Sequence, residues 1–536
     1  MESTPFLKLG TKSQMGTLQF FNNLWQLLEP FSISIYLLLF LLLLLNIFLS
    51  KRNKSCGSKP KLPPSPPKLP LIGNLHQLGE HLHRSLRSLS DKYGPLMLLN
   101  LGQIPTLIVS SPEMVGEIVN THDVVFSSRP KTTASDILFY GHKNVLFAPY
   151  GEFWRQARKI CVLELLSLKK VQSFQFVREE EVEILVNSLR EVCLGGNNSI
   201  DLSKMLISAS NNAMSRCILG HSYKEEDGSI KRLGELSHQM SKQLAAICVG
   251  DFFPSLRFID VLRGFVGRLR STFRAFDAFN DRVIEEHKEA RKFHGGPSET
   301  EDFVDVLLRL QHDPMLGFEL THDHLKAILQ DMLAAGNDTS SAAAVWLMAE
   351  LVRNPRVMKK AQEELRRIVG EKSKVETDGI HQMEYLRCVV KETLRLHPPA
   401  PLLSPRETTA SVQIGGYEIP AKTRVLINAW AIQRDPRSWD KPEEFIPERF
   451  EKNSVNFNGQ DFHFCPFGIG RRRCPGMAFG LVNIEYLIAN LLYSFDWELP
   501  GDCGPPEDLD MSEISGLSVR KKVPLHVLPV ARFYLP

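Results

Sequence analysis

One long apolar segment constrains the fold of this chain more than any other feature. The stretch "HLKAILQDMLAAGNDTSSAAAVWLMAELVRNP", residues 324–355, is apolar on nearly all sides and ends at Asn354-Pro355. Its length predicts a helix of roughly 45 Å, and a helix that is apolar all round must be enclosed by other elements. Because 43% of the 536 residues are hydrophobic, the chain can bury a sizeable core. We therefore expect one large domain, mainly α-helical, built around this helix.

The centre of this segment, "AAGNDTS", is unusually small and polar for a buried helix. Gly336 costs about 1 kcal/mol relative to alanine, and Asp338 and Thr339 are costly to bury without partners. A kink with two satisfied polar side chains is one explanation. In the other, the small residues Ala335 and Gly336 leave room for a ligand beside the helix. Thr339 then bonds to a carbonyl or a bound oxygen, and Asp338 supplies protons.

A glycine-rich loop near the C-terminus is predicted to hold a sulfur anion. In "HFCPFGIGRRRCPGMAFG", residues 463–480, Gly468 and Gly470 allow tight turns before Cys474. The three arginines beside this cysteine favour a thiolate over a thiol. The nine cysteines of the chain lack CxxC spacing, which argues against a disulfide framework and a structural zinc site. We therefore expect this part of the chain to face a reducing compartment.

The N-terminal region is predicted to anchor the chain in a membrane. Residues 31–50 carry no charge and are long enough to cross a bilayer, and the basic "KRNK" at 51–54 follows them. A cleaved signal peptide or a buried helix is the alternative. Basic residues are more numerous after the segment than before it, which places the bulk of the chain in the cytosol. The predicted organisation is an extension at 1–30 across the membrane, an anchor at 31–50, a proline-rich hinge at 51–70 and a cytosolic domain at 71–536.

Small β-sheets are predicted at three places outside the helical region. Residues 95–111 form two apolar runs around a turn, and residues 412–433 have Gly415-Gly416 as a turn signal. The tail at 516–530 alternates enough to be another strand pair. The net charge of +3 gives no indication of nucleic-acid binding.

Several short motifs gain meaning from their order along the chain. W-x-x-x-R, A-G-x-D-T-S, E-x-x-R, P-E-R-F and F-x-x-G-x-R-x-C-x-G follow one another, although the shortest of them recur elsewhere by chance. Over its whole length the chain resembles the cytochrome P450 family. "FAPYGEFWRQARKI", "KETLRLHPPAPLL" and "PFGIGRRRCPGMAFG" look most like the A-type group of plant members. The resemblance implies the cytochrome P450 fold: mainly α with small β-sheets, in a single large domain behind a transmembrane anchor.

The resemblance implies haem b as the cofactor, with Cys474 as its thiolate ligand. Phe467 would pack against the haem, and Gly470 and Gly476 match the signature that surrounds the sulfur. The positions that match propionate contacts are Trp154, Arg158, Arg406 and Arg472. A buried structural charge network would comprise Glu392, Arg395 and Arg449. Asp338 and Thr339 would be catalytic, because they steer protons during oxygen activation.

The implied activity is that of a monooxygenase that uses O₂ to oxidise a small hydrophobic plant specialised metabolite. A terpenoid, a coumarin or other phenolic, and an amino-acid-derived oxime are the candidates, in a pocket that includes Ala335, Gly336, Leu402, Leu403 and Leu517. Since the chain has no Rossmann glycine motif, NADPH acts only indirectly, through NADPH–cytochrome P450 reductase. The reductase would dock on Lys159, Lys169, Lys170 and Arg471. The implied location is the endoplasmic reticulum membrane, with a single span and residues 1–30 on the lumenal side.

Two other functions remain open. A haem-thiolate enzyme can rearrange or dehydrate its substrate without activating oxygen, as in oxime dehydration, but the intact pair of Asp338 and Thr339 argues against this. A non-enzymatic, membrane-tethered haem binder would need neither that pair nor an apolar pocket.

Overall fold

The computed structural model describes residues 35–42, 61–196, 198–220, 229–294, 301–501 and 504–532. The chain divides into two units, residues 1–60 and 61–536. Of the first unit, only residues 35–42 are described, and they are helical. The predicted extension at 1–30, most of the predicted anchor and the first half of the hinge lie outside the described residues. In the second half of the hinge, residues 61–68 run without helix or strand, as its prolines require.

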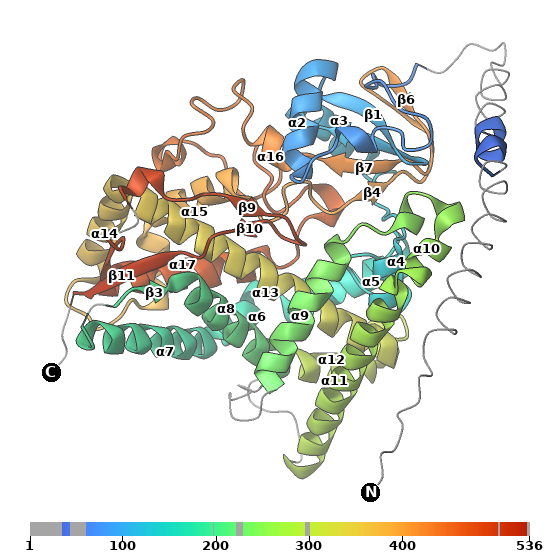
Figure 1. Cartoon of the computed structure of the whole chain (residues 1–536). Coiled ribbons are helices and arrows are strands. Elements are labelled where there is room, and N and C mark those ends of the chain that lie inside the picture. The colour runs from blue at the N-terminus through green and yellow to red at the C-terminus, as the bar shows by residue number, and fades with distance from the viewer. Residues whose placement is uncertain are drawn as a thin grey trace, which may run out of the picture. The chain divides into compact units, whose positions relative to one another are not determined.

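The second unit is mainly α-helical with small sheets, as predicted (Figure 1). Its helices are α2 Leu82–Tyr93, α3 Pro112–His122, α4 Thr133–Leu138, α5 Glu152–Ile160, α6 Leu168–Ser173, α7 Gln175–Leu194, α8 Leu202–Leu219, α9 Ser229–Ala245, α10 Phe258–Leu262, α11 Phe265–His294, α12 Phe303–Gln311, α13 His322–Arg353, α14 Pro355–Val369, α15 Glu384–Leu396, α16 Ala429–Ile432 and α17 Met477–Ser494. Its strands are β1 Leu96–Leu101, β2 Ile104–Val109, β3 Ile200–Asp201, β4 Arg406–Glu407, β5 Val412–Ile414, β6 Tyr417–Ile419, β7 Arg424–Ile427, β8 Phe495–Glu498, β9 Glu513–Ile514, β10 Arg520–Lys521 and β11 His526–Ala531.

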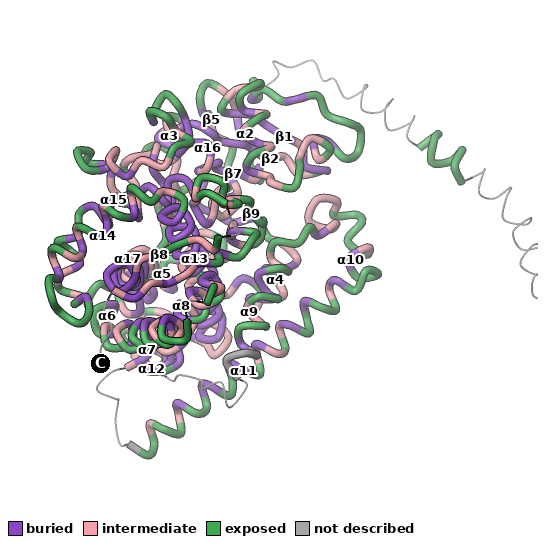
Figure 2. The backbone as a smooth tube through the Cα atoms, turned by 60° about the vertical axis from the view of Figure 1, so that its left-hand side comes forward, coloured by how far each residue is buried: buried purple, intermediate pink, exposed green. Residues whose placement is uncertain are grey.

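The predicted central helix is confirmed as α13, which is continuous over 32 residues. It begins with a capping box, in which the Thr321 side chain accepts a bond from the His324 backbone and the His324 side chain reciprocates. It ends at Asn354, because Pro355 cannot continue the hydrogen-bonding pattern. Most of α13 is buried, and Figure 2 shows it as the purple centre of the unit. The two largest core clusters are built on its two halves, and α7, α8, α15 and α17 contribute to them.

The main sheet has the strand order β1-β2-β7-β4. The hairpin predicted at 95–111 is confirmed, with Leu96 opposite Val109 and Leu101 opposite Ile104. β7 lies parallel to β2, so the sheet joins the N-terminal hairpin to a segment about 300 residues later. β5 and β6 also form the predicted hairpin, because Gly415 and Gly416 adopt positive φ angles of +57° and +75° at its turn.

The predicted pairing within the C-terminal tail is wrong. Both strands exist, but β10 pairs with β9, while β11 pairs with β8 and β3. Pro524 separates the two strands and has no N–H to contribute to a ladder. β11 is therefore the central strand of a three-stranded sheet, between β3 and β8, which come from distant segments of the chain.

One helix in the described part of the chain is long and apolar enough to cross a membrane, namely α17. Most of its residues are buried inside the domain, against α7, α13 and α14. We therefore interpret α17 as a core helix.

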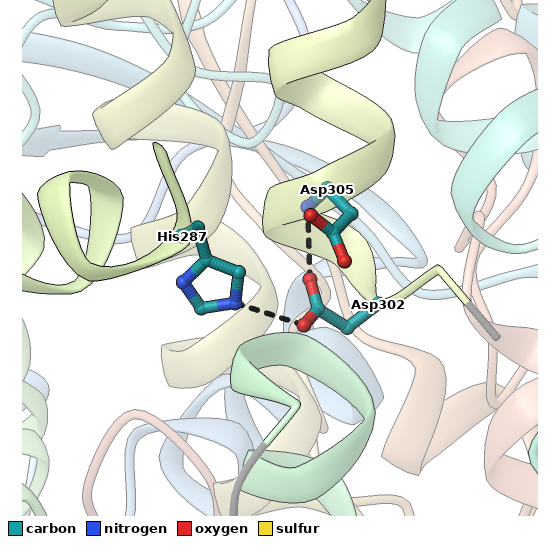
Figure 3. Close-up of side chains that lie close together, drawn as sticks. All are labelled: His287, Asp302 and Asp305. Carbon is teal, nitrogen blue, oxygen red and sulfur yellow. Dashed lines mark hydrogen bonds and ion pairs between the residues drawn. The ribbon is translucent and has the colours of Figure 1, made fainter. Parts of the chain in front are cut away.

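A buried histidine joins three helices on the side of the domain formed by α8, α11 and α12 (Figure 3). His287 of α11 lies 2.9 Å from the carboxylate of Asp302, which caps α12 by accepting a bond from the Asp305 backbone. The other ring nitrogen of His287 lies 2.7 Å from the Val283 carbonyl. Gly220, which ends α8 with a φ angle of +72°, leaves space for Asp302. Because these groups bind one another, the cluster is a structural link between the helices.

This link makes a prediction about stability and pH. Burial alone would lower the pKa of His287, but the contact with Asp302 raises it above the ordinary value of 6.5. The stabilisation is therefore complete below about pH 6.5 and is lost as the pH rises through the raised folded-state pKa. His287→Ala should cost about 1–3 kcal/mol at pH 6 and progressively less at higher pH. Thermal midpoints at several pH values would check this, with the exposed His312→Ala as control; a pH-independent difference would contradict it.

Candidate functional site

The cysteine loop folds as its glycines require. Gly468 and Gly470 adopt φ angles of +76° and +58°, and the second also lies too close to Asp123 to carry a Cβ. The Cys474 amide donates to the Phe467 carbonyl over 2.8 Å, which closes the loop. α17 begins directly after Gly476, whose N–H points at the sulfur and favours its charged form.

The thiol of Cys474 is accessible although protein surrounds it. Enough protein surrounds the sulfur for burial to raise the pKa of Cys474, in spite of the Gly476 amide and the nearby Arg158 and Arg473. Its side chain is nevertheless accessible, whereas Cys465 in the same loop is buried. Two nearby arginines favour the thiolate as expected, namely Arg158 and Arg473, but desolvation outweighs their effect on the pKa of Cys474. A bound metal cation would reverse this balance.

Four guanidinium groups lie close to one another, and one of them, that of Arg158, is near Cys474. Burial and mutual repulsion lower the pKa of Arg472 to about 9, with Arg406 and Arg158 as the repelling neighbours. Burial lowers the pKa of Arg129 well below its usual range, and the other three arginines add to this effect. Among the described residues, only Asp123 lies in ion-pair range of any of the four, at 3.8 Å from Arg406. Arg406 Nη1 is buried and makes no hydrogen bond. The four guanidinium groups therefore have one carboxylate between them among the described residues, and the cluster carries an excess of positive charge.

Backbone carbonyls satisfy many of the guanidinium N–H groups. Arg472 donates to the carbonyls of Ser127, Val145 and Ala148, and Arg129 donates to those of Leu146, Ser404 and Pro405. The indole N–H of Trp154 also donates to the Val145 carbonyl. The ring of Trp154 lies under Arg472, with its centre 4.1 Å from the guanidinium carbon, so Trp154 is part of the arginine cluster that it was predicted to join. Arg158 donates to the Arg473 carbonyl over 2.6 Å.

Sequence reasoning missed Arg129 and Asp331. Arg129 lies in "FSSRP", a loop without periodicity, so its position gave no signal. Asp331 lies two turns before Thr339 on α13, and its buried carboxylate accepts bonds from the Asn144 side chain and from the backbone of Val145 and Leu146. It thereby fixes the loop whose carbonyls hold the arginines.

The Asp331 carboxyl gives a second prediction. Burial raises the pKa of Asp331 from 3.8 to about 7, although its three donors oppose the shift. Since a raised folded-state pKa means stability lost with rising pH, the wild type should lose stability relative to Asp331→Asn between about pH 4 and 7. Asp331→Ala should cost about 1–3 kcal/mol for each stranded donor. Urea titrations of the three proteins at several pH values would measure both effects, and an Asn variant as unstable as the Ala variant would contradict them.

The three residues predicted to form a charge network lie together. Arg395 makes a two-pronged ion pair with Glu392 at 2.7 and 2.9 Å, and both side chains are fully buried. Arg449 reaches the same carboxylate at 3.0 Å. The remaining N–H groups of Arg395 donate to the carbonyls of Gln433, Pro442 and Glu444. This network joins α15 to the segment that precedes the cysteine loop.

The residues at the polar centre of α13, Ala335 to Thr339, have three different surroundings. Ala335 is exposed and Thr339 half-buried, although most of the helix is buried, and the Thr339 hydroxyl donates to the Ala335 carbonyl over 2.7 Å. A Cβ at Gly336 would overlap the end of the Met214 side chain of α8, and Gly336 lines a small cavity together with Met214 and Ser340. Its role in a substrate pocket stays a prediction. Asp338 is buried and contacts Ser518 and Arg520 of the C-terminal hairpin.

The other predicted residues lie at the borders of the domain's cores. Phe467 is half-buried and packs edge-on against Phe457, with ring centres 5.2 Å apart. Leu402 and Leu403 are half-buried beside the main sheet, and Leu517 is half-buried on the β9–β10 hairpin.

Of the predicted docking residues, Lys159, Lys169 and Arg471 are exposed. Lys170 does not belong with them, because it is half-buried and donates to the Glu301 carbonyl.

An accessible thiol beside a cluster with an excess of positive charge fits a thiolate-ligated cofactor that carries carboxylates. Haem has both properties: an iron for the sulfur and two propionates for the guanidinium groups. The observed chemistry of the donor set therefore defines a haem-thiolate site.

Comparisons with known proteins identify the family. The cytochrome P450 family model matches residues 63–526. CYP71AN24, a phenylacetaldehyde oxime monooxygenase of Prunus mume, is 52% identical over 525 residues, covering 96% of this chain and 99% of the relative. Cytochrome P450 71A1 of Persea americana is 53% identical over 492 residues, covering 92% and 98%. A solved zebrafish cytochrome P450 with abiraterone aligns with a TM-score of 0.70 and 26% identity, covering 85% of this chain and 100% of the other. The chain belongs to the cytochrome P450 family.

Membership establishes the class of reaction. The protein is a monooxygenase with a haem-thiolate cofactor, and it uses O₂ together with electrons from a redox partner. When bound, the haem supplies the oxidising chemistry, while the chain holds it, admits a hydrophobic substrate and directs protons.

Proposed function

We propose that this chain oxidises a small hydrophobic plant specialised metabolite, with an aldoxime derived from an amino acid as the first class to test. The relative named phenylacetaldehyde oxime monooxygenase supports this choice, because it matches nearly the whole chain at 52% identity. Relatives named costunolide synthase, from Cichorium intybus, and desmethylyatein synthase, from Sinopodophyllum hexandrum, are 46% identical and keep the terpenoid and phenolic candidates in the test. The exposed Ala335 of α13 is the observation that carries the pocket assignment.

The residue roles that we propose follow from the geometry of the site. Cys474 provides the thiolate, and Arg129, Arg158, Arg406 and Arg472 hold the propionates. Thr339 and Asp338 would hold and pass protons during oxygen activation. Ala335, Leu402, Leu403 and Leu517 line the substrate side.

We further propose that the protein lies on the endoplasmic reticulum, with residues 31–50 as its single span and residues 71–536 in the cytosol. Residues 35–42 are helical, apolar and exposed. A second apolar surface supports contact of the catalytic unit with the bilayer. Its exposed side chains are Leu69, Leu71, Phe258, Val261 and Leu262. The segments that carry them meet at the β1–β2 turn, where Gly102 bonds to Ile72 and Gln103 bonds to Phe252.

The proposed redox partner is NADPH–cytochrome P450 reductase. The exposed Lys159, Lys169 and Arg471 lie on or next to the elements that carry the arginine cluster and the cysteine loop. A cationic surface there suits an acidic partner and would make the association salt-dependent.

The experiment that tests the proposed function is a substrate screen with microsomes containing this protein and the reductase. An aromatic aldoxime, a sesquiterpene and a phenolic would be offered with NADPH and O₂, and products would be detected by mass. Addition of one atom from ¹⁸O₂ supports oxidation. Loss of water without use of O₂ would instead support the dehydratase alternative, and absence of any turnover would favour a haem binder.

Thr339→Ala should separate electron use from product formation. Because the hydroxyl helps to deliver protons, its loss should lower product formed per NADPH by about tenfold or more, with release of hydrogen peroxide. Peroxide and product would be measured together. Thr393→Ala is a matched control, since Thr393 is also a helical threonine that bonds to the carbonyl four residues earlier. Unchanged coupling in Thr339→Ala would overturn the proton role.

A further inference from the structure

The contacts of Asp338 point to a part of the molecule that the proton-delivery role does not yet include. Its carboxylate accepts a hydrogen bond from the Ser518 hydroxyl and forms an ion pair with Arg520. Asp338 and Ser518 are buried, and the Arg520 side chain is 30% exposed. Both partners come from the β9–β10 hairpin, about 180 residues later in the chain.

The structure fixes the backbone next to Arg520. The indole N–H of Trp346 donates to the Val519 carbonyl over 3.2 Å, and the Val519 amide donates to the Pro399 carbonyl over 2.9 Å. Trp346 lies two turns after Asp338 on the same face of α13. The β9–β10 hairpin is therefore attached to α13 at two residues, Asp338 and Trp346.

The other strand of the hairpin, β9, is also held by charged contacts. Glu513, opposite Lys521 in the β9–β10 ladder, lies 2.6 Å from Arg84 and 2.9 Å from His83 of α2. Although burial opposes the shift, these two contacts lower the pKa of Glu513 to about 2. The hairpin thus bridges α2 and the centre of α13 through charged contacts at both ends.

We propose that Arg520 and Ser518 are positioning residues that keep Asp338 ionised and oriented for proton delivery, an inference that rests on the proposed role of Asp338 and Thr339. A buried carboxylate without a cation takes up a proton and keeps it. With Arg520 on one oxygen and Ser518 on the other, both the charge and the rotation of the carboxylate are fixed. Because Leu517 precedes Ser518 directly, a substrate that displaces Leu517 also disturbs this hold. The fit of the substrate therefore affects the amount of product formed per NADPH consumed.

The kinetic test uses the full-length protein with reductase in microsomes. Arg520→Ala should lower product per NADPH about tenfold, with peroxide making up the difference, while substrate affinity stays close to that of the wild type. Arg520→Lys keeps the charge and should restore most of the coupling. If Arg520→Ala does not bind haem, Ser518→Ala replaces it in the test. This variant removes only the hydroxyl that bonds to the Asp338 carboxylate. Wild-type coupling in Arg520→Ala, or a Lys variant as poor as the Ala variant, overturns the proposal.

A second measurement does not depend on turnover. Hydrogen exchange of residues 518–521 should be faster in Arg520→Ala than in the wild type, and unchanged in the control Lys522→Ala, which alters an exposed residue of the same hairpin. Unchanged hydrogen exchange in Arg520→Ala would contradict the claim that the contact with Asp338 fixes the hairpin. The two proposals fail separately: unchanged coupling in Thr339→Ala refutes the proton role itself, whereas uncoupling by Thr339→Ala but not by Arg520→Ala refutes only the inference about the hairpin.

Discussion

Cys474→Ser should abolish the absorption band of the carbonyl adduct of the reduced protein, and with it all turnover. Serine fits the same loop, because the loop is closed by the backbone bond between Cys474 and Phe467 and by two left-handed glycines. A hydroxyl, however, does not give an anion that donates electron density to iron as a thiolate does. Spectra of the reduced protein with carbon monoxide would show the loss directly.

The chain contains a matched control for this experiment. Cys465 lies in the same loop, but it is buried, and burial raises the pKa of Cys465 to about 12. Cys465→Ser should keep the band and the activity. Survival of the band in Cys474→Ser, or its loss in Cys465→Ser alone, would refute the assignment of the ligand.

Glu392→Ala should lower the free energy of unfolding by about 3–5 kcal/mol. The variant strands Arg395, which is fully buried and has its carbonyl contacts arranged around that ion pair, and it also frees Arg449. The loss arises from an uncompensated buried charge. Urea titration followed by loss of haem absorbance would measure it.

Glu363 provides the comparison for Glu392. It stands three residues before Arg366, so it repeats the E-x-x-R spacing, but it is exposed. Glu363→Ala should change stability by no more than about 0.5 kcal/mol. Equal effects of the two substitutions would mean that spacing rather than burial matters.

These results show what local sequence can reveal about this molecule. The central helix, the first hairpin and the glycine turn were predictable because each has its own periodicity or turn chemistry within a few residues. The pairing of the tail was not, since β11 finds its partners in strands that precede it by about 30 and 330 residues. Strand alternation specifies a buried face but not the neighbouring strand.

The same limit applies to the site. Cys474, Thr339 and Glu392 stand in recognisable motifs, so their positions could be predicted. Arg129 and Arg520 could not, because each acts through a contact with an element more than 100 residues away. Gly336 was assigned to a pocket from its small size, and its neighbour Met214 of α8 could not be predicted, because it lies more than 100 residues earlier in the chain.

The four clustered guanidinium groups also bear on the life of the protein in the cell. Without the two negative charges of the prosthetic group, like charges repel one another inside a desolvated space, so the empty chain is strained where the filled one is not. Binding that favours only the folded state raises its population by mass action. Porphyrin supply should therefore set how much of this protein escapes degradation, and a shortage should lower its abundance before it lowers the specific activity of the molecules that remain.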